Sequence, residues 1–260
     1  MASDSTLLVE PLENGVVRLC FNRPGAANSI SQVFADEWVA RLQEITTDDA
    51  IKAVILTGVG ERVFCAGVDL KNPDALDRMT LAESRRRRVM RSLDALLKFE
   101  KPVVAALNGV ASGAGMMLAL LCDIVLARED SYLQLPEIDV GMPTYLGFES
   151  IKLMCGEALA ADLVLSGRRM PFPEAAAAGI IKAAFPAARL VEESERLAAQ
   201  LAAKPPLPYA LNKRWINQHR YRVLEAAAAE SLRVQTLLHS HHEAEEGASD
   251  RVAARPDQQS

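Results

Sequence analysis

Two short segments of the sequence carry glycine and alanine where a surface loop is usually polar. They are residues 64–70 (Phe-Cys-Ala-Gly-Val-Asp-Leu) and residues 108–115 (Asn-Gly-Val-Ala-Ser-Gly-Ala-Gly). Each follows a predicted strand, and its small residues leave backbone N–H groups accessible. One N–H group from each segment could donate to the same oxygen atom and stabilise negative charge that develops on it during a reaction. A tight turn between a strand and a helix explains either segment equally well on its own.

The residues around these glycines exclude several other kinds of site. Leu118 stands where the dinucleotide fingerprint G-x-G-x-x-G requires its third glycine, so NAD binding is excluded there. Neither segment contains the phosphate loop G-x-x-x-x-G-K-S/T or the nucleophile elbow G-x-S-x-G. All histidines lie outside both segments, which gives no support to a Ser-His-Asp or Cys-His arrangement. We attribute the grouping of His239, His241 and His242 to chance and predict no metal site.

Composition and charge place the chain among globular proteins of a reducing compartment. It has 260 residues, of which 50% are hydrophobic and 24% charged, and this excludes a disordered chain. The formal net charge of −5 argues against nucleic acid as a partner. Four cysteines without a C-x-x-C pair suit a reducing cytosol. No signal peptide is recognised, and the apolar tract 103–127 contains Asp123 and three glycines, so we predict a soluble cytoplasmic protein without a membrane span.

The elements around the two segments must position them, and the hydrophobic pattern indicates an α/β core. Asn14-Gly15 predicts a hairpin between strands at 7–12 and 16–21. Further strands, at 53–57, 103–107 and 124–127, alternate with helices at 31–45, 80–99 and 113–121. This alternation is typical of a largely parallel sheet.

From Ser150 onward the predicted elements are helices. The last two, Tyr209–Asn217 and Arg222–Leu238, follow Pro205-Pro206. We therefore predict an α/β core over residues 1–200, a helical region over 201–246 and a flexible tail over 247–260. Trp38 and Trp215 both lie at helical spacing with apolar neighbours and are predicted to be buried.

Seven motifs occur in order along about residues 5–220. They are 21–24 (Phe-Asn-Arg-Pro), 64–70, 101–109 (Lys-Pro-Val-Val-Ala-Ala-Leu-Asn-Gly), 111–115, Cys122-Asp123, Pro136-Glu137-Ile138, and 210–213 (Ala-Leu-Asn-Lys) with Asn217. With these motifs the chain resembles the crotonase superfamily, also called the enoyl-CoA hydratase/isomerase family. The resemblance implies a spiral of repeated ββα units, a C-terminal helical region used in trimerisation, and acyl-CoA thioester substrates that react through an enolate. CoA would then be part of the substrate rather than a separate cofactor, and the chain would form a homotrimer or homohexamer.

The resemblance also implies roles for individual residues. The backbone N–H groups of Val68 and Ala114 would form an oxyanion hole, and Glu137 would be the acid/base. Lys213 would reach a CoA phosphate. The substrate and its CoA portion would contact Ala26, Cys65, Ala66, Asp69, Leu70, Lys71, Gly113, Met117, Tyr145 and Lys213.

One position departs from the hydratases of this family, which use two glutamates. The second of them is present as Glu137, but the first position, two residues beyond Gly115, is Met117. Hydration of an enoyl thioester requires a water molecule that is held and activated while a proton reaches C2, and a single carboxylate does this poorly. Moving a double bond from C3–C4 to C2–C3 needs only one base. Glu137 alone therefore favours isomerisation over hydration.

Other activities stay open. Pro143 and Tyr145 would narrow the pocket as in decarboxylase-like relatives, which leaves acyl-CoA decarboxylation or thioester hydrolysis as alternatives, although core packing explains Tyr145 as well. A CoA-binding or RNA-binding protein without turnover is a third possibility. Arg85–Arg88 and Arg91 form a basic cluster on the helix whose predicted buried face is Val89, Leu93, Leu96 and Leu97. For that cluster we predict a solvated helix face, with contact to a CoA phosphate as the alternative.

Overall fold

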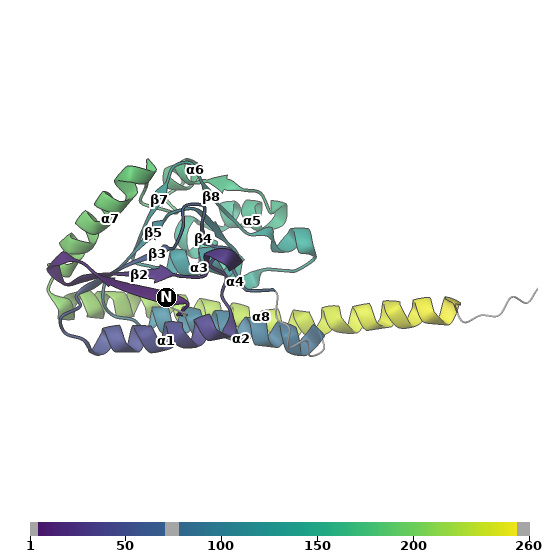
Figure 1. Cartoon of the computed structure of the whole chain (residues 1–260). Coiled ribbons are helices and arrows are strands. Elements are labelled where there is room, and N and C mark those ends of the chain that lie inside the picture. Colours follow the sequence, from purple (N-terminus) through teal and green to yellow (C-terminus); the bar gives the residue numbers. More distant parts are fainter. Residues whose placement is uncertain (1–4, 71–77, 254–260) are drawn as a thin grey trace, which may run out of the picture.

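The computed structural model describes residues 5–70 and 78–253 of the chain. Its main sheet has six strands in the spatial order β1-β2-β3-β5-β7-β10 (Figure 1). β1 and β2 form an antiparallel hairpin, and the remaining neighbouring strands of this sheet are parallel. The predicted hairpin and largely parallel sheet are confirmed. The strands are β1 (Leu7–Pro11), β2 (Val16–Phe21), β3 (Ala53–Gly58), β5 (Val103–Leu107), β7 (Ile124–Arg128) and β10 (Ala183–Phe185).

Helices cover both faces of the main sheet, which explains why its strands read as apolar runs rather than as alternating patterns. On one face, α7 (Ala187–Ala202) packs over Ala53 and Ile55 of β3. On the other face, Val54 and Leu56 of the same strand belong to the large core that also contains α1 (Gln32–Thr47) and α2 (Arg78–Leu97). Trp38 of α1 is buried in this core, as predicted.

A second, smaller sheet consists of β4 (Val63–Cys65), β6 (Val110–Ser112), β8 (Tyr132–Gln134) and β9 (Met170–Pro171), in that order. β4, β6 and β8 run parallel to one another, and β9 is antiparallel to β8. Strands of two or three residues carry too little pattern to be recognised in a sequence. This small sheet nevertheless positions the functional segments described below.

The remaining helices connect and flank the two sheets. All eight residues of α3 (Ala114–Leu121) are buried, so the apolar tract 103–127 lies in the core as a strand, a loop, a helix and a strand. Along residues 5–70 and 78–253, no helix is both long enough and apolar enough to cross a lipid bilayer. The shorter C-terminal helices are α4 (Tyr145–Cys155), α5 (Glu157–Ser166) and α6 (Phe172–Ala177).

The last helix, α8 (Pro206–Ala253), is continuous over 48 residues and extends beyond the body of the molecule (Figure 1). Two helices were predicted here, but residues 217–222 contain no glycine or proline that would end a helix. Residues 247–253, expected in the tail, are also helical. The prediction that Trp215 is buried is wrong: its side chain lies on the outside of α8 with 77% of its surface exposed, and its neighbour Ile216 is 50% exposed.

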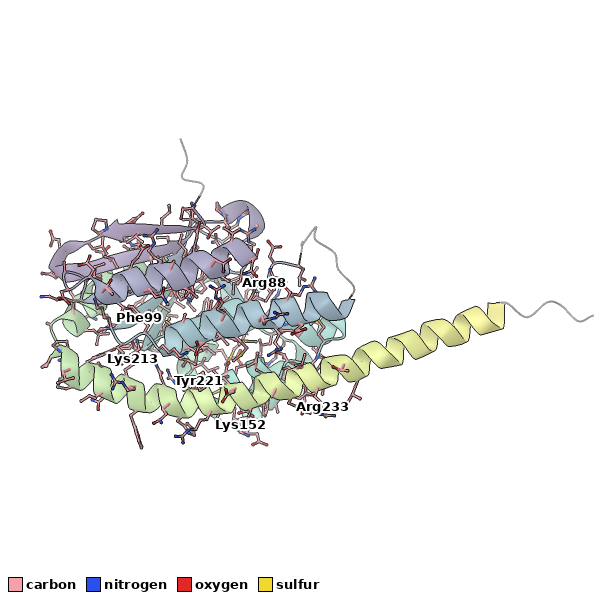
Figure 2. The ribbon with its side chains drawn as sticks, turned by 90° about the horizontal axis from the view of Figure 1, so that it is seen from below. Arg88, Phe99, Lys152, Lys213, Tyr221 and Arg233 are labelled. Atoms are coloured by element: carbon pink, nitrogen blue, oxygen red, sulfur yellow. The ribbon has the colours of Figure 1, made fainter. Side chains whose placement is uncertain are left out.

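Lys213 fastens α8 to the core. Its ammonium group, buried with only 4% of the residue exposed, donates to Asp123 Oδ2 and to the Lys101 carbonyl oxygen, both at 2.7 Å, and lies 5.4 Å from the centre of the Phe99 ring (Figure 2). Asp123 Oδ2 also accepts from the Val103 N–H at 2.7 Å. The expected contact between Lys213 and a CoA phosphate is therefore corrected, because this side chain is enclosed and already neutralised by a carboxylate.

Replacing Lys213 with methionine should destabilise the fold. The change leaves the mostly buried Asp123 carboxylate without the ammonium group that pairs with it, and breaking a buried ion pair typically costs about 3–5 kcal/mol of unfolding free energy. Arg214→Met is the matched control, because Arg214 pairs with Glu100 at the surface, where such pairs contribute about 0–1 kcal/mol. Urea unfolding measures both. Equal losses in the two variants would contradict the assigned role of Lys213.

Candidate active site

Three segments of the site follow three neighbouring strands of the small sheet. β4 leads into Ala66–Val68, β6 leads into Gly113 and Ala114, and β8 leads within three residues to Glu137. The register pairs Cys65 with Ala111 and continues to β8 on the other side of β6. Because these strands are parallel, their carboxyl ends lie at the same edge of the sheet, as in many α/β ligand sites. The fold thereby brings together segments about 70 residues apart in the chain.

The two glycine loops contact each other closely. Gly67 and Gly113 have φ angles of +94° and +51°, a backbone region that favours glycine. A Cβ atom on Gly67 would lie 3.1 Å from the Ser112 carbonyl oxygen and 3.4 Å from the Ala114 nitrogen. Both glycines are thus required by backbone conformation, and Gly67 also by the close approach of the loops.

The N–H groups of Val68 and Ala114 are available at this junction. The Gly67 carbonyl accepts from Ile30 N–H at 2.8 Å, which fastens the first loop beside Val68. Ala114 is the first residue of α3, where a helix has no internal acceptor for its N–H groups. Within the described part of the chain, neither N–H donates a hydrogen bond. Val68 and Ala114 both line a cavity of about 240 Å³, which Glu137 also lines.

Glu137 lies in a short 3-10 helix, Pro136–Val140, with its carboxyl group turned toward the loops. A Cβ atom on Gly113 would lie 3.1 Å from Glu137 Oε1, so the absence of a side chain there lets the carboxyl group approach. Glu137 Oε2 is buried and has no hydrogen-bond partner among the described residues. Burial raises the pKa of Glu137 from 4.5 to about 7. A carboxyl group in this state can both take up and release a proton near neutral pH.

A family model described as Enoyl-CoA hydratase/isomerase matches residues 12–256 of the chain. The chain belongs to the enoyl-CoA hydratase/isomerase family. It is 34% identical to the 2,3-dehydroadipyl-CoA hydratase of Escherichia coli K12, over 93% of this chain and 94% of that protein. The crystal structure of an enoyl-CoA hydratase from Bacillus anthracis is similar, with a TM-score of 0.77, 28% identity, and 92% and 96% of the two chains covered. The crystal structure of an enoyl-CoA hydratase/isomerase from Mycobacterium paratuberculosis is also similar, with a TM-score of 0.79 and 26% identity. The match covers 91% of this chain and 94% of that one.

These similarities confirm the predicted membership of the enoyl-CoA hydratase/isomerase family and the predicted α/β fold of the crotonase type. The chain therefore belongs to a family of acyl-CoA enzymes.

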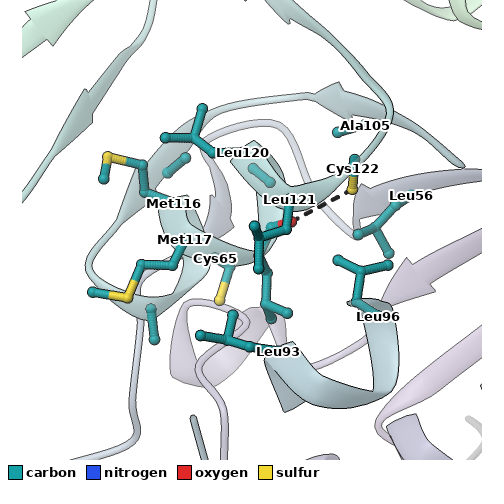
Figure 3. Packing of buried hydrophobic residues seen from close by; sticks show 14 of the residues in the cluster. Leu56, Cys65, Leu93, Leu96, Ala105, Met116, Met117, Leu120, Leu121 and Cys122 are labelled. Carbon is teal, nitrogen blue, oxygen red and sulfur yellow. Dashed lines mark hydrogen bonds between the residues drawn. The ribbon is translucent and has the colours of Figure 1, made fainter. Parts of the chain in front are cut away.

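Met117 makes the cavity wall apolar where the hydratases of the enoyl-CoA hydratase/isomerase family are expected to carry their first glutamate. It is 4% exposed and lines the cavity from α3. Figure 3 shows it among the buried residues around that helix, as it shows Cys65 and Leu93. Of the described residues that line the cavity, Glu137 is the only carboxylate.

Several other residues that were predicted to contact the substrate line this cavity, and some do not. Ala66, Leu70, Gly113 and Tyr145 line the same cavity as Glu137. The predicted contact between the Cys65 side chain and CoA is corrected. This side chain is buried against Gly115, where a Cβ atom would lie 2.7 Å from Cys65 Sγ, and burial raises the pKa of the Cys65 thiol to about 12. Its thiol packs in the core and cannot contact CoA.

The remaining CoA contacts predicted from family resemblance lie apart from the cavity or outside the described residues. Asp69 Oδ2 accepts from Arg23 Nη2 at 2.8 Å, next to the first glycine loop. Ala26 belongs to a turn, Pro24–Ala26, that does not line the cavity. Lys71 lies outside the described residues. The roles of Asp69 and Ala26 in binding CoA stay predictions.

The arginine cluster is the part of the site that the sequence interpretation missed. Arg85 and Arg86 line the cavity from α2, and Arg88 is buried with 3% exposure, so the predicted solvated face is corrected for these residues. The signal was present in the periodicity: Arg85 precedes Val89 by four residues and therefore lies on the face predicted to be buried.

Proposed function

We propose that this protein isomerises 3-enoyl-CoA thioesters to 2-enoyl-CoA thioesters, with Glu137 as its single acid/base. One observation carries the proposal: the Glu137 carboxyl group, with a pKa near 7, is the only described carboxylate in its cavity. Val68 and Ala114 line the same cavity, and their backbone N–H groups have no acceptor among the described residues. The thioester oxygen would accept from the N–H groups of Val68 and Ala114. Their donation stabilises the negative charge that forms on this oxygen when C2 loses a proton.

The proposed reaction needs only these groups. The Glu137 carboxylate takes the proton from C2, and the electron pair of the broken C–H bond forms the enolate held by Val68 and Ala114. The same carboxyl group then returns the proton at C4 as the double bond moves to C2–C3. Atoms and charge balance without water or an added reductant. The apolar Met117 surface supports this choice, because it offers no second carboxylate to hold water.

The test compares 3-hexenoyl-CoA with 2-hexenoyl-CoA as substrates. Isomerisation of the first should exceed hydration of the second by about 10²-fold, the lower end of what a positioned acid/base contributes. Appearance or loss of the conjugated thioester is followed by ultraviolet absorbance. Efficient hydration would overturn the proposal and favour the activity named for the Escherichia coli relative. Inactivity on both would favour decarboxylation, thioester hydrolysis or binding without turnover.

We also propose that the chain assembles as a homotrimer or homohexamer and acts in the cytoplasm. The exposed apolar residues of α8 support assembly, because isolated surface residues are common but a run of them along one helix indicates an interface. They are Leu207, Leu211, Trp215 and Ile216, each at least half exposed.

A further inference from the structure

The α2 side of the cavity carries two guanidinium groups, those of Arg85 and Arg86, that form no ion pair with a carboxylate of residues 5–70 and 83–234. Arg85 and Arg86 both line the cavity, and the Nε atom of each is buried without a hydrogen-bond partner in the described part of the chain. Arg85 Nη2 donates to the Leu70 carbonyl at 3.1 Å, which holds that side chain beside the first glycine loop. The next residue of α2, Arg87, differs from these two: it is exposed and forms an ion pair with Glu83 at 3.3 Å.

No described carboxylate of the cavity pairs with these arginines. Glu137 Oε2 has no hydrogen-bond partner among the described residues, so this carboxylate oxygen is not bound by either arginine. Asp69, on the loop beside them, forms its ion pair with Arg23 at 2.8 Å. Arg88, also on α2 (Figure 2), is buried and adds positive charge, and its Nε and Nη2 atoms have no hydrogen-bond partners among the described residues. Enclosed positive charge of this kind is unfavourable until an anion pairs with it.

The size of the cavity indicates which part of a ligand would supply the anion. At about 240 Å³ it lies below the roughly 300–1,000 Å³ typical of pockets that enclose a drug-sized ligand. It suits the acyl group rather than a whole CoA thioester. Val89, Met117 and Leu146 also line it, so a short carbon chain would contact apolar side chains. An acyl chain that also ended in an anionic group would contact both the apolar side chains and the two arginines.

We infer that the acyl group ends in a carboxylate that Arg85 and Arg86 bind, which makes the substrate a CoA monothioester of a short dicarboxylic acid. This inference rests on the proposed function, since it places the acyl chain in the same cavity as Glu137. The planar guanidinium group donates two parallel N–H bonds to a carboxylate, and such charge-assisted bonds are stronger than neutral ones. An acyl chain ending in a methyl group would leave both guanidinium groups without an anion.

The test measures binding, so that it does not depend on turnover. Adipyl-CoA and hexanoyl-CoA have the same six-carbon chain and lack the double bond, and calorimetry gives their Kd values. Wild-type protein should bind adipyl-CoA roughly 10- to 100-fold more tightly, the range expected for hydrogen bonds to a charged group. The double variant Arg85→Met/Arg86→Met should lose this preference and keep its Kd for hexanoyl-CoA within about twofold. Arg87→Met, on the same helix turn, should behave as wild type.

Distinct results separate this inference from its competitors. Equal Kd values in the wild type would overturn it, whatever the variants do. Equal weakening of both ligands in the double variant would also overturn it and assign the arginines to the CoA phosphates, which both ligands share. Arg86→Lys keeps the charge and protects the test against a folding defect, and it should retain part of the preference. Intact preference with no isomerase activity would contradict the proposed reaction while leaving the carboxylate site in place.

Discussion

Glu137→Gln should reduce isomerisation of 3-hexenoyl-CoA about 10²- to 10⁴-fold, the range that a positioned acid/base contributes. Glutamine has nearly the same shape but cannot take a proton from C2, so acyl-CoA binding should change little. Asp139→Asn is the matched control, because Asp139 lies in the same short helix but is exposed and does not line the cavity. Steady-state kinetics for both variants checks the prediction. Near-normal turnover by Glu137→Gln would remove Glu137 from the mechanism.

The pH dependence of kcat/KM should show whether Glu137 acts first as a base or as an acid. Its pKa is about 7, and the carboxylate form takes the proton from C2. Wild-type kcat/KM should therefore rise as the pH increases through about 7 and then level off. A profile that falls over this range would mean that Glu137 acts first as an acid, as in hydration.

The same pKa predicts an effect on stability. Burial raises the pKa of Glu137 from 4.5 to about 7, so between these values the folded protein holds a proton that the unfolded chain releases. The stabilisation from that proton is present below about pH 4.5 and is lost as the pH rises through about 7. Glutamine stays neutral, so Glu137→Gln should be more stable than wild type at pH 8, by up to about 3 kcal/mol, and the difference should shrink on acidification.

Ala114→Pro should lower kcat about 10²- to 10³-fold, the usual effect of losing one donor from an oxyanion hole. Proline lacks the N–H group that Ala114 presents to the cavity. The fold should persist, because Ala114 is the first residue of α3 and follows its N-terminal cap, Gly113. Proline is favoured at this helical position, where the N–H has no internal acceptor.

Glu157→Pro controls for the effect of proline itself. Glu157 is also the first residue of a helix, α5, and also follows a glycine cap, Gly156. It is exposed and lies outside the cavity, so its activity should equal that of wild type. Circular dichroism tests whether both variants fold. A folded Ala114→Pro protein with full activity would exclude this N–H group from catalysis.

The two glycine loops and Glu137 could be found in the sequence because their chemistry depends on residue type. Gly67 and Gly113 occupy backbone conformations that favour glycine, so the motif of small residues can be recognised in the sequence. Their meeting point could not be derived from periodicity, since it depends on three-residue strands such as β4 and β6. The family resemblance, rather than the pattern, led to the prediction that Val68 and Ala114 act together.

The errors concern side chains whose surroundings are made by distant segments. Lys213 looks like an exposed cation on an amphipathic helix until α8 packs beside Asp123, 90 residues earlier in the chain. Trp215 looks like a core residue, but its helix faces outward at that position. Arg85 and Arg86 look solvated because arginine rarely lines a buried wall. Helical periodicity predicts which residues share a face, but the tertiary packing determines what that face meets.

The length of α8 has a consequence for how amide hydrogens exchange along it. Toward its N-terminal end the helix is fastened by buried side chains, including Asn217 and Leu224, so exchange there should require large-scale unfolding. Beyond the body, backbone hydrogen bonds have only the helix itself to protect them, and fraying should release them from the C-terminal end. Ser231, which lines the cavity, lies between these regimes. A ligand that fills the cavity should therefore move the boundary of slow exchange outward along α8, which makes the helix a reporter of occupancy.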